Sequence, residues 1–314
     1  MAQNQHSSGD VIADRRADYA RMLAESGDHH AAAELIEQAL ELAPLWAAGW
    51  FRLGEYSEKS GQRDQAVKAY EKVAELDEEG IFAAPLKLAV LGAAETPEQP
   101  PSRYVEGLFD DYAERFETSL VKKLDYSVPE KLAALIETAR PPGDSFRCVV
   151  DIGCGTGLLG MEIRDWAKRL EGFDISTNML AKAEEKGIYD HLAQADLSLD
   201  EEASGLFVDE HAKGRADLVA AADVMMYLGS LETVMPLVLA LLSEGGIFAF
   251  SVEDAGDDEG FVLQPSLRYA HSETYIRNLL AAFDMQVLQK RKTTIRKDAG
   301  KPLSGILFLA ARRA

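Results

Sequence analysis

The sequence of 314 residues is poor in cysteine: Cys148 and Cys154 are the two it has, and both fall around the end of one expected strand. Cysteines placed so close together argue against a disulfide framework and fit a reducing cytosol. No apolar run approaches the roughly 20 residues of a membrane-spanning helix. The first residues, MAQNQHSSGD, lack the basic and apolar regions of a signal peptide. These absences predict a soluble, cytoplasmic protein without a membrane partner.

Basic residues are also scarce, because 33 Lys and Arg stand against 53 Asp and Glu, which gives a net charge of -20. Such a surface repels polyphosphate, so a nucleic-acid partner is not expected. No His, Asp or Glu cluster has the spacing of metal ligands, and we expect no metal. The 47% hydrophobic content supports globular cores, and the length favours two domains.

The first hundred residues contain a repeat, since residues 13–46 resemble residues 47–80 after a shift of 34 positions. Each unit has two amphipathic helical patterns broken at a glycine. Small residues are expected to let paired helices approach, and large ones to fill the space between them. The matching pairs are Tyr19 with Leu53, Ala20 with Gly54, Gly27 with Gly61, Ala32 with Ala66, Ile36 with Tyr70, and Leu42 with Leu76. The period and residue types resemble the tetratricopeptide repeat.

The segment IFAAPLKLAVLGAAE is expected to form a helix that caps the second unit. We therefore assign residues 1–12 to a disordered N-terminus and residues 13–95 to the repeat domain. Prolines between positions 97 and 101 stop any helix and predict a linker over residues 96–103. So short an array fits a groove for a protein partner, and it also fits a scaffold that docks on its neighbour or dimerises.

Residues 104–314 alternate apolar strands with helical patterns, which predicts a largely parallel sheet covered on both faces. The last two apolar runs lack an intervening helix and are expected to form an antiparallel hairpin at the sheet edge. The expected strands are FRCVVDIG, RLEGFD, LAQAD, ADLVAAA, GIFAFSVE, MQVLQKRK and GILFLAA. Helices are expected over 107–124, from about residue 127 onward, and near 157–168, 176–186, 231–242 and 272–282. The segment 200–214 is ambiguous.

The stretch VVDIGCGTGLLG, residues 149–160, contains two overlapping glycine patterns. D-x-G-x-G-x-G is typical of S-adenosylmethionine (SAM) sites, and G-x-G-x-x-G of dinucleotide sites. Asp151 ends the strand, where its carboxylate would repel a pyrophosphate but suit the sulfonium and ammonium of SAM. The segment resembles motif I of class I SAM-dependent methyltransferases.

The resemblance extends over nearly the whole chain from about residue 13. Repeats followed by FDDYAERFETSLVKKLDYSVPEKL, then VAADVMMYLGSLE and LRYAHSETYI, resemble bacterial predicted methyltransferases with tetratricopeptide repeats. This implies an α/β fold: a Rossmann-like class I methyltransferase sheet, largely parallel with an antiparallel C-terminal hairpin, preceded by an all-α repeat domain. Residues 104–314, including N-terminal lid helices, would form the methyltransferase domain.

The resemblance also implies a set of residues that bind SAM. Asp174 would accept the ribose hydroxyls, Met179 would pack on adenine, and Asp196 would lie near the adenine amino group. Helix capping by the two carboxylates and core packing of Met179 are the structural alternatives. The full set is Asp151, Gly153, Cys154, Gly155, Gly157, Asp174, Ile175, Met179, Asp196, Leu197, Ala222 and Asp223 (these two at the methionine part), with Tyr112 on the lid.

The acceptor is less determined. No N-P-P-Y or D-P-P-Y follows the fourth strand, which disfavours methylation of DNA bases or glutamine. His271, expected in a loop after the fifth strand, is the candidate general base, or else a structural histidine. Tyr227 either orients the acceptor or packs. The basic residues Lys290, Arg291, Lys292, Arg296, Lys297 and Lys301 either bind an anionic carrier or form a solvated edge strand.

The sequence thus predicts a SAM-dependent methyltransferase that acts on an oxygen or nitrogen of a small molecule or a carrier-bound metabolite. Three alternatives stay open. The repeats could recruit a protein that is methylated, the fold could be an inactive SAM-binding scaffold, or the glycine loop could serve an NAD-linked oxidoreductase.

Overall fold

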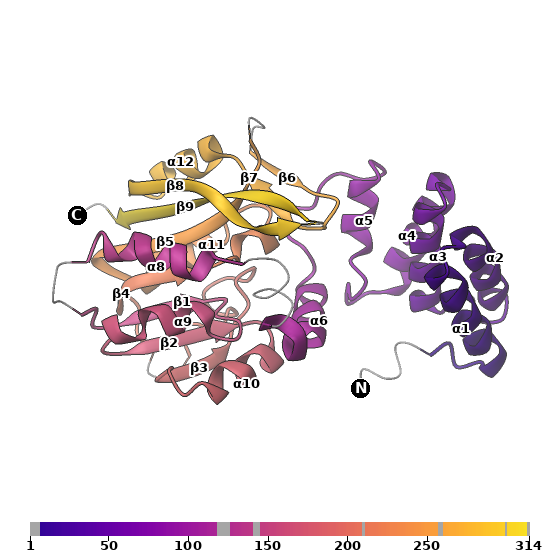
Figure 1. Ribbon diagram of the computed structural model, residues 1–314, viewed down its shortest axis with the longest axis horizontal. Coiled ribbons are helices and arrows are strands. Elements are labelled where there is room, and N and C mark those ends of the chain that lie inside the picture. The colour runs from indigo at the N-terminus through magenta and orange to yellow at the C-terminus, as the bar shows by residue number, and fades with distance from the viewer. Residues whose placement is uncertain are drawn as a thin grey trace. The chain divides into compact units, whose positions relative to one another are not determined.

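The computed structural model describes residues 7–117, 126–140, 145–208, 211–256, 260–298 and 300–312. The chain divides into two compact units, Met1–Tyr104 and Val105–Ala314. The first unit is helical and the second contains the sheet (Figure 1). No described helix is both long and apolar enough to cross a membrane.

The first unit consists of consecutive helices that pack mainly on their chain neighbours: α1 (Val11–Glu25), α2 (His29–Leu40), α3 (Ala47–Lys59), α4 (Arg63–Leu76) and α5 (Ala84–Val90). Gly27 and Gly61 have φ angles of 91° and 78°, in the left-handed region that glycine adopts without strain. They end α1 and α3 and allow the sharp return of the next helix.

The packing inside the repeats differs from the expectation in one respect. Ala13, Ala17 and Ala20 bury the inner face of α1, whereas Tyr19 is 63% and Leu42 is 44% exposed. The expectation that these two large residues fill the space between helices is therefore wrong, because alanines form the buried face of α1 and Leu42 lies after the end of α2.

Two boundaries of this unit also differ from the expectation. Helix α1 begins at Val11, inside the segment expected to be disordered, because the Asp10 carboxylate accepts the N–H groups of Ile12 and Ala13. Helix α5 is only seven residues long, and it packs with Leu88 on Tyr70 and Val73 of α4.

The second unit begins with α6 (Ser102–Tyr112, whose first residues belong to the first unit) and a short 3₁₀ helix, η2 (Ala113–Arg115). The helix expected over 107–124 ends partly outside the described residues. The later helical elements are α8 (Val128–Glu137), α9 (Leu158–Ile163), η3 (Arg164–Trp166), α10 (Thr177–Glu185), η4 (Met225–Tyr227), α11 (Val234–Leu241) and α12 (Glu273–Ala282).

The strands form one sheet in which β3, β2, β1, β4 and β5 lie side by side and run parallel. The long strands β8 and β9 form an antiparallel hairpin, and β9 pairs antiparallel with β5. The strands are β1 (Val149–Ile152), β2 (Leu170–Asp174), β3 (His191–Gln194), β4 (Ala216–Ala221), β5 (Leu242–Asp254), β6 (Phe261–Leu263), β7 (Tyr269–His271), β8 (Met285–Asp298) and β9 (Lys301–Arg312).

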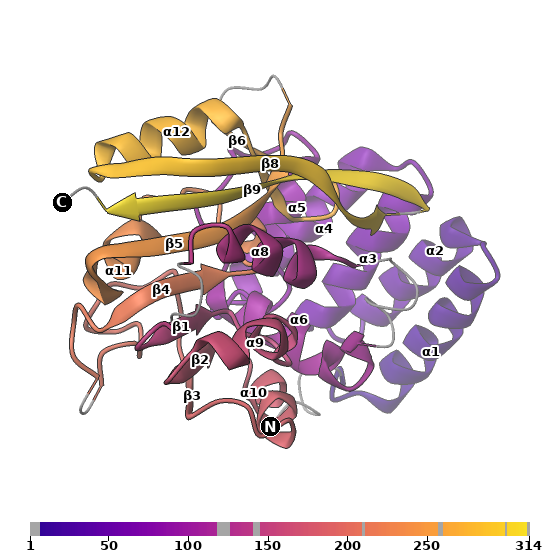
Figure 2. The ribbon, with the colours of Figure 1, turned by 60° about the vertical axis from the view of Figure 1, so that its left-hand side comes forward.

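Helices cover both faces of this sheet, which gives three layers (Figure 2). Helices α8 and α9 share a core with one face of β1, β4, β5 and β9. Helices α11 and α12 share a second core with the opposite face of the same strands. Alternate residues of a strand point to opposite faces, so a strand buried on both sides is apolar throughout.

Two short strands were missed. Strands β6 and β7 are three residues each, and β7 pairs parallel with the end of β5. Runs this short give no detectable alternation in the sequence. Residues 200–208 and 211–214 form turns without a helix or strand.

Candidate active site

The glycine loop lies where β1 ends and α9 begins, at the carboxyl edge of the sheet. Gly153, Gly155 and Gly157 all have positive φ angles, of 68°, 54° and 87°. A methyl group added at Gly155 would meet no atom within 4 Å, whereas one at Gly153 would overlap Val224. The loop thus leaves open space in front of Gly155, which is what the close approach of a ligand requires.

Asp174, at the end of β2, holds this loop in place. Its carboxylate accepts the Gly155 N–H at 2.8 Å and the Ser176 N–H at 2.9 Å. Burial raises the pKa of Asp174 to about 6, although these backbone hydrogen bonds oppose the shift. Asp174 therefore joins the ends of β1 and β2, a structural role that the sequence did not indicate.

Asp151 is a buried carboxylate with one free oxygen. Tyr189 donates its hydroxyl to Oδ2 at 2.8 Å, while Oδ1 has no hydrogen-bond partner among the described residues. Burial raises the pKa of Asp151 to about 7. A buried carboxylate oxygen without a partner is costly, and a cationic ligand would satisfy it.

Tyr189 also explains the second glycine pattern. A methyl group on Gly160 would overlap the Tyr189 ring, and one on Gly157 would lie 2.9 Å from it. Gly160 therefore serves close packing against Tyr189.

Five further residues of the predicted set remain: Cys154 in the glycine loop, and Ile175, Met179, Asp196 and Leu197 around α10 and β3. Met179 is fully buried in the first turn of α10, where its N–H donates to Ser176. Asp196 uses Oδ1 to accept the N–H and hydroxyl of Ser198 and so caps a turn. Ile175 is half-buried, and Cys154 and Leu197 are buried.

Ala222 and Asp223 follow β4 and approach the glycine loop, since Val224 packs on Gly153. The Asp223 N–H donates to Ser251 Oγ at 2.8 Å, and its side chain accepts from Arg296 through Oδ2. The other oxygen, Oδ1, is buried without a partner among the described residues. The carboxyl ends of β1, β2 and β4 thus each present one aspartate.

Helix α6 and η2 lie against these loops. Phe109 packs edge-on against Tyr227 with ring centroids 4.9 Å apart, and Tyr112 packs on Phe116 at 5.5 Å. On the polar side of the helix, Asp110 accepts from Ser176 Oγ at 2.6 Å. Tyr112 and Tyr227 are both half-buried, and burial raises the pKa of Tyr227 to about 12.

His271 lies elsewhere than expected. It is on strand β7 rather than in a loop, it is fully buried, and its Nε2 is 2.8 Å from the Gly229 carbonyl oxygen. Burial lowers its pKa to about 4. His271 has no exposed surface, and its Nδ1 is buried without a hydrogen-bond partner among the described residues.

The basic C-terminal cluster is divided by the structure. Lys290 pairs with Glu273 and Lys292 with Asp254, while Arg291, Lys297 and Lys301 are exposed. Arg296 instead is 5% exposed and pairs with Asp223 and Glu253. Assigning Arg296 to a solvated edge strand was therefore wrong.

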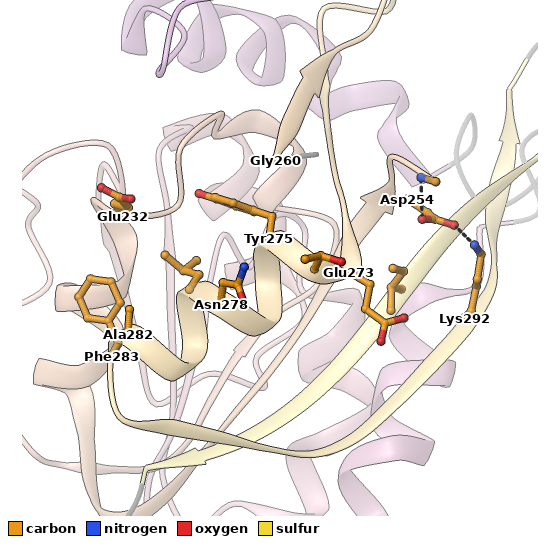
Figure 3. A pocket seen from close by; sticks show the side chains of 13 residues that line it. Glu232, Asp254, Gly260, Glu273, Tyr275, Asn278, Ala282, Phe283 and Lys292 are labelled. Atoms are coloured by element: carbon orange, nitrogen blue, oxygen red, sulfur yellow. Dashed lines mark hydrogen bonds and ion pairs between the residues drawn. The ribbon is translucent and has the colours of Figure 1, made fainter. Parts of the chain in front are cut away.

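A hollow of about 880 Å³ is lined by residues of α12 and by Asp254 at the end of β5. Figure 3 shows Tyr275 and Asn278 of α12, and Phe283 just after it, along this hollow, with Lys292 paired to Asp254 at one side. Glu253 and Asp254 are successive strand residues and point to opposite faces of the sheet. The hollow is thus separate from the Arg296 cluster. Among the described residues, no group of three or more His, Cys, Asp or Glu could hold a metal ion.

Comparison with known families decides the class of protein. The family model of the methyltransferase domain matches residues 124–291, more than half of the chain. The chain belongs to the methyltransferase domain family. A tetratricopeptide repeat model matches residues 47–79 in the first unit. SAM is the cofactor of this domain, and its sulfonium and ammonium suit the free carboxylate oxygen of Asp151 and the open space at Gly155.

Curated relatives of the methyltransferase domain align over a part of their length. Malonyl-[acyl-carrier protein] O-methyltransferase of Enterobacter lignolyticus is 32% identical over 113 residues, which cover 36% of this chain and 41% of that protein. Trans-aconitate 2-methyltransferase of Delftia acidovorans is 33% identical over 120 residues, which cover 37% and 41%. The match spans about two fifths of these relatives.

Solved structures share the fold at low identity. The 1,6-didemethyltoxoflavin-N1-methyltransferase of Burkholderia thailandensis, solved with S-adenosylhomocysteine, has a TM-score of 0.52 at 17% identity, covering 70% of this chain and 94% of that one. A [4+2]-cyclase also has a TM-score of 0.52, at 15% identity, covering 69% and 98%. The fold therefore supports more than one reaction, and the chemistry must be argued from the site.

Proposed function

We propose that the protein transfers the methyl group of SAM to an oxygen or nitrogen of a small acidic or carrier-bound metabolite. The observation that carries the proposal is the set of aspartates at the carboxyl ends of β1, β2 and β4 beside an open glycine loop. Two of them, Asp151 and Asp223, keep a buried oxygen free. Two curated relatives that match in this region are named for malonyl-carrier and trans-aconitate acceptors, both of which carry free carboxylates.

The mechanism follows from what each residue can do. Bound SAM supplies an electrophilic methyl group on a sulfonium. Asp174 would accept the ribose hydroxyls while it keeps the Gly155 N–H in place. Asp151 would satisfy positive charge with its free oxygen. Phe109 and Tyr227 would exclude water from the methyl group, since displacement depends mainly on positioning the acceptor.

Binding of SAM is tested first, by calorimetry on wild type, Gly155→Ala and Gly187→Ala. Both glycines have positive φ angles, 54° and 62°, and neither would clash with a methyl group. The backbone cost is therefore matched at about 1–2 kcal/mol. Gly155→Ala should abolish or strongly weaken SAM binding, and Gly187→Ala should leave it unchanged. Wild type that binds no SAM would refute the proposal.

The acceptor is tested by incubation with methyl-labelled SAM and three sets of acceptors: carrier-bound malonyl groups, small polycarboxylic acids, and amines. Label on the carrier-bound malonyl groups or on the polycarboxylic acids supports transfer to oxygen, and label on amines supports transfer to nitrogen. If the methyl group is transferred to none of these acceptors, the result favours a SAM-binding scaffold.

A protein acceptor is the second candidate, because the repeat unit exposes Tyr19 and Met22 on α1, at 63% and 58%. In that case, incubation of the full chain with methyl-labelled SAM and a cell extract would produce a labelled protein band. Substitution of both residues by serine should then reduce labelling of the band without changing SAM binding.

A further inference from the structure

Arg296 is buried although it belongs to an exposed strand. Arg291 and Lys297 on the same strand face solvent. The pairing of β8 with β9 shifts register between Thr294 and Arg296, as in a β-bulge, and Ile295 and Arg296 are both buried in succession. A bulge re-aims side chains that strict alternation would place outside.

The partner strand provides the room for this bulge. Gly305 on β9 faces Ile295, and a methyl group at Gly305 would lie 2.8 Å from the Val252 carbonyl oxygen and overlap Ile295. Only glycine lets Ile295 sink into the core here, and Arg296 is thereby turned toward the ends of β4 and β5.

The guanidinium of Arg296 binds two carboxylates. It donates to Asp223 Oδ2 and to Glu253 Oε1, and it lies 3.5 Å from the Met226 sulfur. Arg268 donates to the same Glu253 oxygen at 2.7 Å. Planar, rigid donors of this kind fix the orientation of the carboxylates they bind.

Asp223 is held in an unusual position by these contacts. Its φ angle is 63°, in the left-handed region that costs a non-glycine residue free energy. Its N–H is fixed by Ser251 and its Oδ2 by Arg296, so that Oδ1 is left buried without a partner among the described residues. A carboxylate restrained at both ends with one free oxygen is arranged to receive a donor from a ligand.

We propose that Arg296 is a positioning residue, which aims the free oxygen of Asp223 at the ammonium group of SAM. The inference rests on the proposed function, since it presumes SAM in the glycine loop. Asp223 is next to Val224, which packs on Gly153. Burial raises the pKa of the Tyr126 phenol, and the charges of Asp223 and Asp151 both add to that shift.

Charge supports the same arrangement. Burial raises the pKa of Asp223, and Arg296 is the larger of the influences that oppose it. Among the described residues, the other charged or titratable groups that act on it are Glu253, which raises the pKa, Arg268, which lowers it, and the phenols of Tyr126 and Tyr227. Loss of Arg296 would therefore raise the pKa of Asp223 further and leave it protonated at a higher pH.

Two probes separate the amino-acid end, which carries the ammonium, from the rest of the cofactor. S-Adenosylhomocysteine keeps the amino-acid end and lacks the sulfonium, and 5′-methylthioadenosine lacks the amino-acid end. Calorimetry on Arg296→Met and Asp223→Asn should show S-adenosylhomocysteine binding weakened roughly tenfold or more, with 5′-methylthioadenosine binding unchanged. Arg291→Met, an exposed position on the same strand, should change neither.

The pH profile distinguishes positioning from a structural role. The affinity for S-adenosylhomocysteine should fall as the pH decreases. In Arg296→Met this fall should begin at a higher pH than in wild type. Arg296→Lys should restore the profile in part, and Asp223→Asn should lack this transition. Unchanged S-adenosylhomocysteine binding, or an equal loss of both probes, overturns the inference. Wild type that binds neither probe would instead refute the proposed function.

Discussion

Asp151 is subject to opposing requirements of stability and binding. It is 1% exposed, and its carboxylate has one hydrogen bond, from Tyr189. Ionising such a group costs free energy in the protein without ligand, whereas the neutral form would bind a cation poorly. The pKa of Asp151, raised to about 7, reflects these opposing requirements.

This conflict predicts a dependence on pH. The unfolded pKa of an aspartate is about 3.9, so a folded value near 7 means that the ionised form destabilises the protein. Stability without SAM should therefore decrease as pH rises from about 4 to about 7 and stay lower above it. Asp151→Asn should be more stable than wild type at pH 8, by at most about 4 kcal/mol, and equal near pH 4. Chemical denaturation at both pH values measures this.

Binding should change in the opposite sense. SAM should bind wild type less tightly as pH falls from 8 to 6, because protonated Asp151 must release its proton first. Asp151→Asn should bind SAM weakly at every pH. A smaller dependence of its SAM affinity on pH should remain below about pH 6, because Asp174 still titrates there. An Asn variant that binds SAM as well as wild type would remove Asp151 from the binding site.

Residues of the site differ in how far the sequence reveals them. Asp151 and Asp174 are visible because each ends an apolar strand, and parallel strands share one carboxyl edge. The burial of Arg296 was not predicted, because the bulge breaks the two-residue period from which the inward and outward faces of a strand are assigned. His271 was misplaced because a strand of three residues has no recognisable alternation.

At the scale of elements, α6 and η2 are attached to the loops of the site through a line of acids. Glu106, Asp110, Glu114 and Glu117 are three or four residues apart and so face one side. Their partners are Gln194 at 3.2 Å, Ser176 at 2.6 Å, Lys182 at 3.1 Å, and Thr156 at 2.8 Å with Lys186. These partners belong to the glycine loop, to β3, and to α10 with the two residues that cap it.

Lys186 is the contact that joins this element to the glycine loop. It donates to the Thr156 carbonyl oxygen and to the Glu117 carboxylate. Lys186→Met keeps the apolar stem and removes the donors, so the backbone amides of residues 113–117 should exchange hydrogen faster. A partly exposed ion pair contributes up to about 1 kcal/mol, so SAM affinity should fall by no more than about fivefold.

Hydrogen exchange followed by mass spectrometry measures this change. Lys168→Met, an exposed lysine of the same unit, is the control and should leave exchange of residues 113–117 as in wild type. Equal exchange in both variants would mean that the other contacts, such as Asp110 with Ser176 and Phe109 with Tyr227, are enough to hold the element.

The helical character of α6 could be predicted from its apolar spacing, but its partners could not. They lie between 39 and 88 residues away in the sequence. Periodicity along one segment indicates which face is buried without indicating what buries it. The same limit applies to the first unit, where the repeat predicted the helices and wrongly placed Tyr19 between them.

At the scale of the whole molecule, the two units have separate cores. The helices of the first unit pack on one another through their own clusters, and the sheet of the second is covered by its own helices. Separate cores of this kind can unfold independently, so the full chain should show two thermal transitions in calorimetry.

Only the transition of the second unit should respond to SAM. At a concentration 100 times its Kd, a ligand that binds the folded state stabilises it by about 2.7 kcal/mol. For a unit of roughly 200 residues this corresponds to a rise in Tm of about 5–10 °C. Gly155→Ala should keep both transitions and lose the shift, because it blocks the open face of the loop without a clash in the core. A single transition that moves as a whole with SAM would mean that the repeats and the methyltransferase domain unfold together, and the repeats would then be part of the cofactor-stabilised structure.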